Sequence, residues 1–301
     1  MKTVGKRATL PNWLKKTLPS DGAAVETARL LERLGLATIC QSAKCPNIWE
    51  CFSRKIATIL ILGRQCTRKC RFCAVGDGQP AGVDEDEPRR VAEAIRELGL
   101  RHAVITSVTR DDLSDGGAAH FAKVVEEILS VNGATTVEVL TPDFAGRTDV
   151  LRRIIEAGPV IFGHNVETVP RLYSQVRPGA DYSRSLRLLE AVRELSPPGL
   201  LTKSGLMVGL GETLNEVLDA FRDLRSVRCD IVTVGQYLQP TAESLPVNEF
   251  VTPETFQDLE QKALGMGFRG AFCGPFVRSS YLADRFVMRK NAGETAERTM
   301  N

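Results

Sequence analysis

The chain has 301 residues and a formal net charge of +2; 43% of its residues are hydrophobic and 25% are charged. These are ordinary globular values, and the length fits one large domain or two small ones. Such a small charge gives no reason to expect a nucleic-acid partner. The longest apolar run, IATILIL at 56–62, is too short to cross a membrane, and the basic N-terminus lacks an apolar secretory core. We therefore expect a cytoplasmic protein without membrane or nucleic-acid contacts.

Strand-like and helix-like segments alternate from about residue 55 onward. Six apolar runs predict buried strands at 56–62, 102–108, 136–142, 159–166, 201–210 and 230–237. Helical patterns lie between them at 88–99, 118–130 and 213–226. This alternation predicts an α/β fold with a parallel sheet covered by helices. Periodicity alone does not distinguish an open doubly wound sheet from a partly or fully closed barrel.

The two ends of the chain lie outside this alternation. We expect residues 1–54 to form an N-terminal extension and residues 268–301 a C-terminal extension. Both would pack on the core at 55–267 to make one integrated domain.

Six of the eight cysteines fall into two closely spaced triplets: Cys40, Cys45 and Cys51, followed by Cys66, Cys70 and Cys73. A disulfide framework is not expected in a chain without an export signal. Clustered thiols are typical of a metal or iron–sulfur site, which usually needs four ligands, yet each triplet supplies three. Thiols without a function and a structural zinc site are the alternatives.

The second triplet directly follows the first predicted strand, where parallel β/α proteins build their active sites. Its C-x3-C-x2-C spacing is unusual for zinc, and three thiolates can hold a cubic cluster while leaving its fourth iron open. The pattern resembles the signature of the radical S-adenosylmethionine superfamily. That resemblance implies that S-adenosylmethionine chelates the open iron, and that its reductive cleavage yields methionine and a 5′-deoxyadenosyl radical.

A glycine-rich stretch on the fifth predicted strand agrees with this resemblance. GLMVGLGE, which includes Gly205, Gly209 and Glu212, fits the superfamily pattern G-x-I-x-G-x-x-E, with Met207 in the isoleucine position. The glycines would let the backbone approach the adenine of the cofactor closely.

Longer blocks resemble one family within the superfamily, the lipoyl synthases. In order along about 36–285, these blocks are PNIWECF, CTRKCRFCAV, TRDDLSDGG, EVLTPDF, HNVETVPRLY, VRPGADYSRSL, TKSGLMVGLGET, DIVTVGQYLQP and GPFVRSSYLA. The resemblance implies a partial (β/α)6 barrel. It also implies the insertion of two sulfur atoms, at C6 and C8, into an octanoyl chain on a carrier-domain lysine. Two molecules of S-adenosylmethionine would be consumed, and an auxiliary 4Fe–4S cluster would donate the sulfur.

The resemblance also assigns the ligands. The second triplet would hold the radical-generating 4Fe–4S cluster, and the first would hold the auxiliary 4Fe–4S cluster. The fourth auxiliary ligand would be Ser280 of RSSY, whose alkoxide we expect to be displaced easily when the cluster is consumed. We interpret Cys229 and Cys273 as small buried hydrophobes instead.

Other polar residues near predicted strand ends are candidate contacts for S-adenosylmethionine. They are Thr106 and Ser107 after the second strand, Asn165 after the fourth, and Arg177 in VRPGADY. Arg110, Asp111 and Asp112 either orient the cofactor or stabilise their loop. Of the histidines, we expect His120 on a solvated helix face and His164 in a satisfied structural role.

The implied partners are octanoylated lipoyl-carrier domains, namely the E2 subunits of 2-oxoacid dehydrogenases and the glycine cleavage H protein. An electron donor such as ferredoxin or flavodoxin and a cluster-assembly carrier are implied as well. One alternative function is that of an RNA methylthiotransferase-like two-cluster enzyme, although the chain has no room for that family's extra domains. A non-catalytic zinc-binding module is the other.

Overall fold

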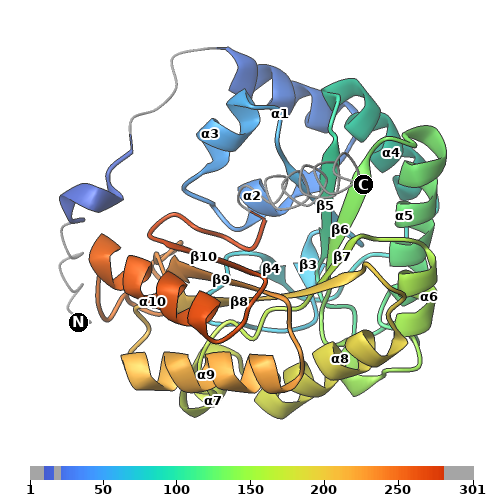
Figure 1. The fold of residues 1–301 in the computed structure, drawn as a ribbon. Helices are drawn as coiled ribbons and strands as arrows, with labels where there is room; N and C mark the ends of the chain where they lie inside the picture. Colours follow the sequence, from blue (N-terminus) through green and yellow to red (C-terminus); the bar gives the residue numbers. More distant parts are fainter. Residues whose placement is uncertain (1–9, 17–21, 281–301) are drawn as a thin grey trace, which may run out of the picture.

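The computed structural model describes residues 10–16 and 22–280, and a mostly parallel sheet of eight strands forms its centre (Figure 1). In spatial order the strands are β1 (Ala37–Thr38), β2 (Thr58–Ile61), β5 (His102–Ser107), β6 (Thr136–Leu140), β7 (Ile161–Gly163), β8 (Leu201–Val208), β9 (Ile231–Gln236) and β10 (Gly270–Gly274). A separate two-stranded ribbon consists of β3 (Gln65–Cys66) and β4 (Gly76–Asp77).

The strand order follows the chain order, which identifies an incomplete barrel. From β2 to β10 each strand pairs in parallel with the next, and only β1 is antiparallel to its neighbour β2. A doubly wound sheet would reverse its order at a switch point, and this sheet does not. Within the described ranges β10 does not pair with β1, so the ring stays open. The predicted α/β fold with a partial barrel is confirmed.

Helices cover the outer face of the sheet (Figure 1). The longer ones are α4 (Glu87–Leu98), α5 (Ala118–Val131), α6 (Leu151–Glu156), α8 (Tyr182–Leu195), α9 (Leu214–Ser226) and α10 (Pro253–Gly265). The N-terminal extension contributes η1 (Asn12–Leu14), α1 (Ala23–Arg33), α2 (Ile39–Ser42) and α3 (Ile48–Ser53). Loops after the strands carry η2 (Phe144–Gly146), η3 (Pro170–Leu172) and α7 (Tyr173–Val176).

Local sequence signals explain where several helices begin and end. Gly99 ends α4 in the left-handed conformation with φ of 67°, which glycine adopts without the strain of a Cβ. Thr213 and Glu216 form a reciprocal capping box at the start of α9, which satisfies two backbone N–H groups that lack helical partners.

The sequence analysis did not predict β10. Residues from 268 onward were expected outside the βα pattern, and this expectation is wrong for Gly270–Gly274, which pairs in parallel with β9. The segment reads GAFCG, with a glycine at each end and only three apolar residues between them, so it carries a weak strand signal. Pairing with β9 and packing against α10 form the strand.

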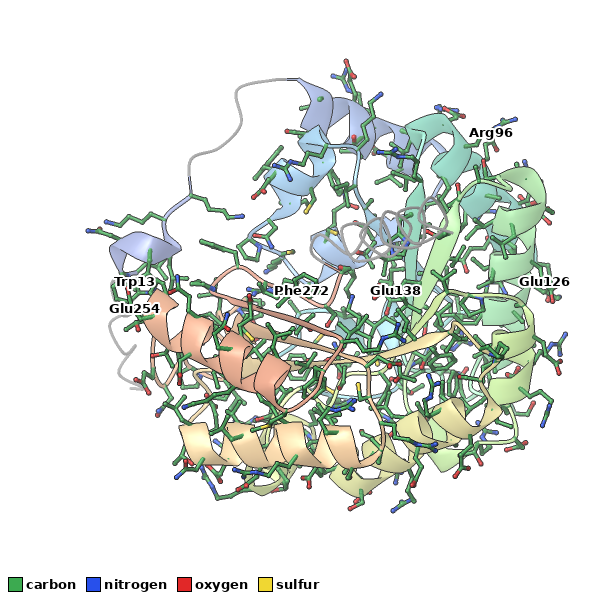
Figure 2. The ribbon with its side chains drawn as sticks, viewed as in Figure 1. Trp13, Arg96, Glu126, Glu138, Glu254 and Phe272 are labelled. Carbon is green, nitrogen blue, oxygen red and sulfur yellow. The ribbon has the colours of Figure 1, made fainter. Side chains whose placement is uncertain are left out.

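A buried ion pair connects two strands of the sheet near their N-terminal ends. Lys203 Nζ on β8 lies 2.9 Å from Glu138 Oε1 on β6, and both side chains are almost fully buried. Burial opposes ionisation of Glu138, but Lys203 and then His102 hold its pKa below the usual range. In Figure 2 Glu138 lies inside the molecule, whereas Arg96 and Glu126 project from the outer helices. Polar groups at this end of the sheet are thus largely paired with one another.

Two histidines show how tertiary contacts decide a side chain's environment. The expectation that His120 lies on a solvated face is wrong: its side chain is buried, and Nε2 lies 2.7 Å from Glu87 Oε2. The structural role predicted for His164 is confirmed, because its Nδ1 lies 2.9 Å from Thr141 O and its Nε2 lies 2.9 Å from Ser185 Oγ.

Among the described residues, no helix is long and apolar enough to span a membrane.

Candidate active site

The second cysteine triplet lies at the carboxyl end of the sheet, on the loop after β2; it comprises Cys66, Cys70 and Cys73. Backbone hydrogen bonds tie this loop to its neighbours on both sides. Thr67 N donates to Thr109 O at 3.1 Å, and Arg71 N donates to Val176 O at 2.9 Å. The loop is therefore held against the ends of two other βα units.

Backbone N–H groups point at two of these sulfurs. Cys66 Sγ accepts from Arg68 N at 3.4 Å and from Thr109 N at 3.3 Å, and Cys73 Sγ accepts from Val75 N at 3.4 Å. N–H donors stabilise a thiolate and tune the reduction potential of an iron–sulfur cluster that the thiolate binds.

Burial disfavours ionisation of these thiols in the absence of a cation. Burial, together with the neighbouring Cys70 and Cys66, raises the pKa of Cys73 to about 12. Burial also raises the pKa of Cys70, against the opposing effect of Arg177. Such thiols become thiolates once a metal centre supplies positive charge, so the donor set fits a thiolate-bound cluster.

The first triplet is built on two short helices of the N-terminal extension. Cys40 lies on α2, Cys51 lies on α3, and Cys45 lies in the turn between them with its N–H donating to Cys40 O at 2.9 Å. Burial raises the pKa of Cys51 to about 12, and Cys40 and Cys45 add to this effect. The three sulfurs are therefore close enough to interact electrostatically.

Ser280 reaches this triplet from the far end of the described chain. Thr58 Oγ1 on β2 donates to Ser280 Oγ at 2.7 Å. Thr58 also hydrogen-bonds Cys40, whose pKa burial raises to about 11 while those hydrogen bonds partly offset the rise. Asn47 Nδ2, between Cys45 and Cys51 in the chain, donates to Phe276 O at 2.7 Å. The Ser280 hydroxyl thus shares a partner with one cysteine of the first triplet.

Neither triplet is arranged around a single ion. In the described part of the chain, no three His, Cys, Asp or Glu side chains gather tightly enough to hold one metal ion. A cubane cluster needs a wider arrangement, because each cysteine binds a different iron at a different corner.

Three of the predicted cofactor contacts carry a buried polar atom without a protein partner. These atoms are Ser107 Oγ, Asn165 Oδ1 and Arg177 Nε. Buried polar atoms are almost always hydrogen-bonded in folded proteins, so each unpartnered one needs an explanation. S-adenosylmethionine carries hydroxyl, amino and carboxylate groups. These groups could accept from a donor such as Arg177 Nε, donate to an acceptor such as Asn165 Oδ1, and hydrogen-bond a hydroxyl such as that of Ser107. Thr106 differs, since its hydroxyl donates to Leu140 O at 2.8 Å.

The glycine-rich stretch is packed against protein atoms. A Cβ at Gly205 would lie 2.8 Å from each of three side-chain oxygens, those of Asn165, Thr233 and Ser279. Gly209 has φ of 97°, and a Cβ there would collide with the Gln236 side chain and the Glu249 carbonyl. The Glu212 carboxylate accepts from Gly209 N at 2.5 Å and from Leu210 N at 3.0 Å, which fixes the turn.

Arg110 and Asp112 stabilise the loop after β5. Arg110 is buried, pairs with Asp112 at 2.8 Å and donates to Leu62 O and Ala81 O. Of the two roles that the sequence left open for this loop, these contacts favour the stabilising one.

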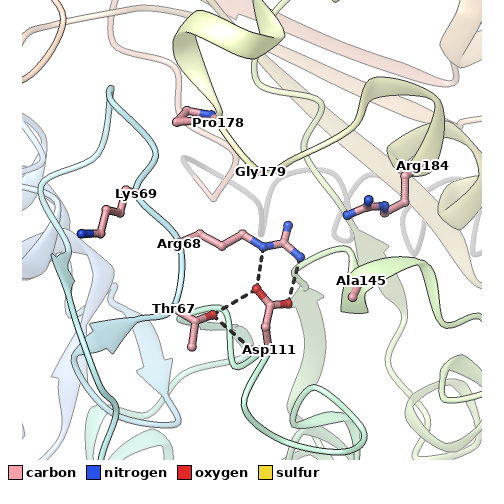
Figure 3. A pocket seen from close by; sticks show the side chains of 8 residues that line it. All are labelled: Thr67, Arg68, Lys69, Asp111, Ala145, Pro178, Gly179 and Arg184. Atoms are coloured by element: carbon pink, nitrogen blue, oxygen red, sulfur yellow. Dashed lines mark hydrogen bonds and ion pairs between the residues drawn. The ribbon is translucent and has the colours of Figure 1, made fainter.

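A pocket of about 560 Å³ adjoins the loop of the second triplet (Figure 3). The Arg68 guanidinium lies at this pocket and binds Asp111 through two hydrogen bonds of 2.8 and 2.9 Å. Arg68 also lies 2.6 Å from Asp143, whose pKa is held at about 2 by Arg68 even though burial opposes ionisation. Ion pairs therefore anchor the outer side of the cysteine loop.

Comparison with known proteins identifies the family. The Radical SAM superfamily model matches residues 60–224, which is more than half of the chain. The lipoyl synthase of Caldanaerobacter subterraneus subsp. tengcongensis is 56% identical over 91% of this chain and 95% of its own length. The lipoyl synthase of Desulfotalea psychrophila is 52% identical over 94% of both chains. This chain belongs to the lipoyl synthase family. It is an enzyme of the radical S-adenosylmethionine superfamily, whose members carry a 4Fe–4S cluster and S-adenosylmethionine.

Solved structures of more distant proteins share the fold. Methylornithine synthase superposes with a TM-score of 0.53 at 14% identity, covering 85% of this chain and 84% of that one. Streptococcus suis SuiB bound to S-adenosylmethionine gives a TM-score of 0.56 at 11% identity, covering 83% of this chain and 60% of that one. At these identities the likeness establishes the fold alone.

Two residues beside Asn165, Glu167 and Ser279, are not predicted from the sequence of this lipoyl synthase family member. Glu167 is a non-glycine residue with φ of 65°, and its Oε1 accepts from Asn165 Nδ2 at 3.0 Å. Burial raises the pKa of Glu167, against the effects of Arg177 and Arg278. Ser279 accepts from Asn165 at 2.7 Å. HNVET and RSSY contain these residues, so the polar side chains within the two motifs are the signal that could identify them.

Proposed function

We propose that this enzyme inserts two sulfur atoms, at C6 and C8, into an octanoyl chain attached by an amide to a lysine of a carrier protein. The observation that supports the proposal most strongly is the pair of cysteine triplets, one of which lies beside the Ser280 hydroxyl. When bound, S-adenosylmethionine and its 4Fe–4S cluster supply a 5′-deoxyadenosyl radical, and an auxiliary 4Fe–4S cluster supplies the sulfur.

In this proposal the two triplets have different duties. Cys66, Cys70 and Cys73 hold the radical-generating cluster and leave its fourth iron to S-adenosylmethionine. The auxiliary cluster is held by Cys40, Cys45 and Cys51, with Ser280 as its fourth ligand. An alkoxide is a harder and more basic ligand than a thiolate, so protonation of Ser280 would release one iron easily as sulfur is withdrawn.

The proposed cofactor contacts divide between direct and supporting roles. Ser107, Asn165 and Arg177 present unpartnered polar atoms to S-adenosylmethionine. Gly205 and Gly209 support the site by leaving room for Ser279 and for the Gln236 side chain, and Glu212 holds their turn. Thr106 supports the adjoining strand through Leu140.

The family implies a lipoyl-carrier protein as substrate. We propose octanoylated E2 subunits of 2-oxoacid dehydrogenases and the glycine cleavage H protein as carriers, a ferredoxin or flavodoxin as electron donor, and a separate carrier for cluster assembly. We further propose a cytoplasmic enzyme in which the extensions at 1–54 and 268–301 form one domain with the core. Phe276 and Asn47, one from each extension, are hydrogen-bonded to each other, which supports a single domain.

An anaerobic assay tests the function directly. The reconstituted protein is incubated with an octanoyl-lysyl peptide, a reductant and S-adenosylmethionine, and the products are identified by mass spectrometry. We expect 5′-deoxyadenosine together with a peptide that has gained two sulfur atoms. Absence of both products from protein that carries its iron and sulfide would reject the proposal.

A further inference from the structure

The segment 276–280 contacts residues of both candidate sites. At the start of the segment, Phe276 O accepts a hydrogen bond at 2.7 Å from Asn47 Nδ2, which lies beside the first triplet. The other end places Ser280 on Thr58. Between these anchors, Ser279 lies against residues on the S-adenosylmethionine side. The two serines of RSSY therefore contact different sites although they are adjacent in the chain.

Glycines on β8 and β9 make room for this segment. A Cβ at Gly235 would lie only 2.0 Å from Val277 O, so an alanine at this position would collide with the backbone of the segment. At Gly205 a Cβ would approach Ser279 Oγ to 2.8 Å. The segment thus packs closely against two glycines, and this packing requires that neither position carries a side chain. Such close packing is evidence that the segment binds here specifically.

Ser279 orients the amide of Asn165. Asn165 Nδ2 donates to Ser279 Oγ at 2.7 Å and to Glu167 Oε1 at 3.0 Å. An amide has two N–H donors, so these two acceptors fully occupy the nitrogen end of the side chain. The oxygen end, Asn165 Oδ1, lies beside Gly205, 2.8 Å from the position that a Cβ there would take; it is buried and has no hydrogen-bond partner in the protein.

We propose that Ser279 is a positioning residue that couples the two cluster sites, because it aims Asn165 Oδ1 at S-adenosylmethionine while its neighbour Ser280 binds the auxiliary cluster. The inference rests on the proposed roles of Asn165 and Ser280. When Ser280 is bound at the auxiliary site, the segment is fixed and Ser279 holds the Asn165 amide in its receptive orientation. When Ser280 is released, Ser279 is freed and the affinity for S-adenosylmethionine falls.

Coupling of this kind is reciprocal. If seating of Ser280 strengthens the binding of S-adenosylmethionine, then bound S-adenosylmethionine must strengthen the seating of Ser280 by the same factor. In the proposed function, the first sulfur insertion removes sulfur from the auxiliary cluster. Loss of that sulfur would then change the affinity of the radical site for S-adenosylmethionine, through the adjacent residues Ser280 and Ser279.

The test measures equilibrium binding of radiolabelled S-adenosylmethionine to fully reconstituted, oxidised protein, in which no cleavage occurs. The variants are Ser279→Ala, Ser280→Ala and the double variant, and Ser130→Ala on the exposed face of α5 is the matched control. Iron content and thermal melting establish that each variant is folded and loaded. We expect Ser279→Ala to weaken binding about three- to tenfold, the effect of one hydrogen bond, and Ser280→Ala about two- to threefold.

The double variant decides whether the two serines act together. Coupling predicts that it binds no more weakly than Ser279→Ala alone, because releasing Ser280 acts only through Ser279. Wild-type affinity in Ser279→Ala, or a double variant whose loss equals the product of the single losses, would overturn the inference. Failure of the proposed function has a different signature: wild-type protein that carries its iron and sulfide would then form neither 5′-deoxyadenosine nor thiolated peptide.

Discussion

The two cysteine triplets have the same number of ligands but are built in different ways. Cys66, Cys70 and Cys73 lie on one loop, which is held by hydrogen bonds within itself and to the segments that follow β5, β7 and β9. Cys40, Cys45 and Cys51 lie on short helices outside the barrel and meet a segment more than 220 residues away in the chain, since Thr58 and Ser280 are 222 residues apart. One site is local, and the other is assembled from both ends of the chain.

This difference matches the proposed duties of the two sites. A site that keeps its cluster and exchanges a small cofactor benefits from a rigid loop beside unpartnered polar atoms. A site whose cluster is consumed benefits from a ligand on a separate segment that can withdraw. The following variants test this comparison, from the largest expected effect to the smallest.

Loss of a cysteine from the local site is expected to stop all chemistry. Cys70→Ala leaves the radical cluster with two ligands, so formation of 5′-deoxyadenosine should fall by more than about a thousandfold, because the cofactor is no longer held and reduced. Liquid chromatography of the reaction mixture measures it. Cleavage at more than a tenth of the wild-type rate would contradict the assignment of this triplet.

Loss of a cysteine from the assembled site is expected to separate cleavage from sulfur insertion. Cys45→Ala should still produce 5′-deoxyadenosine, within about threefold of the wild-type rate, but no thiolated peptide, since the radical site keeps its ligands. Mass spectrometry of the peptide and chromatography of the nucleoside are run on the same sample. Thiolated product from this variant would show that the first triplet does not supply the sulfur.

The nature of the fourth ligand is expected to set how fast iron leaves. Ser280→Cys replaces an alkoxide by a thiolate that iron holds more firmly, so iron release during turnover should slow by roughly tenfold. A chelator that changes colour on binding ferrous iron follows the release. If iron loss and turnover both equal those of the wild type, Ser280 does not have the proposed role.

The planar group of Arg177 is expected to contribute modestly to cofactor affinity. Its Nη1 donates to Asn165 O at 3.0 Å and to the Tyr173 hydroxyl at 3.0 Å, while Nε remains free. Arg177→Lys keeps the positive charge but loses the planar guanidinium and its several N–H donors. Binding of S-adenosylmethionine should therefore weaken about five- to tenfold. Arg171→Lys, at the exposed pair with Glu216, is the matched control. Equal affinity in the two variants would remove Arg177 from the site.

The sequence predicted features that depend on short-range patterns. The six apolar strands and the two triplets all depend on neighbouring residues. Features that depend on distant contacts were missed. The strand β10 forms because β9 offers an open edge, and His120 is buried because Glu87 of another helix receives it. For the same reason, the contact of Ser279 with Asn165 could not be inferred from the RSSY motif alone, because the two residues are 114 positions apart in the chain.

The central claim is that the two triplets hold two separate 4Fe–4S clusters, and counting iron and sulfide tests it most directly. The wild-type protein and two triple cysteine-to-alanine variants, one for each triplet, are reconstituted anaerobically and analysed for iron, sulfide and zinc. We predict about eight irons and eight sulfides in the wild type and about four of each in either variant, because each cubane contains four of both. Bound zinc without sulfide, or a variant that loses all of its iron at once, would contradict the account.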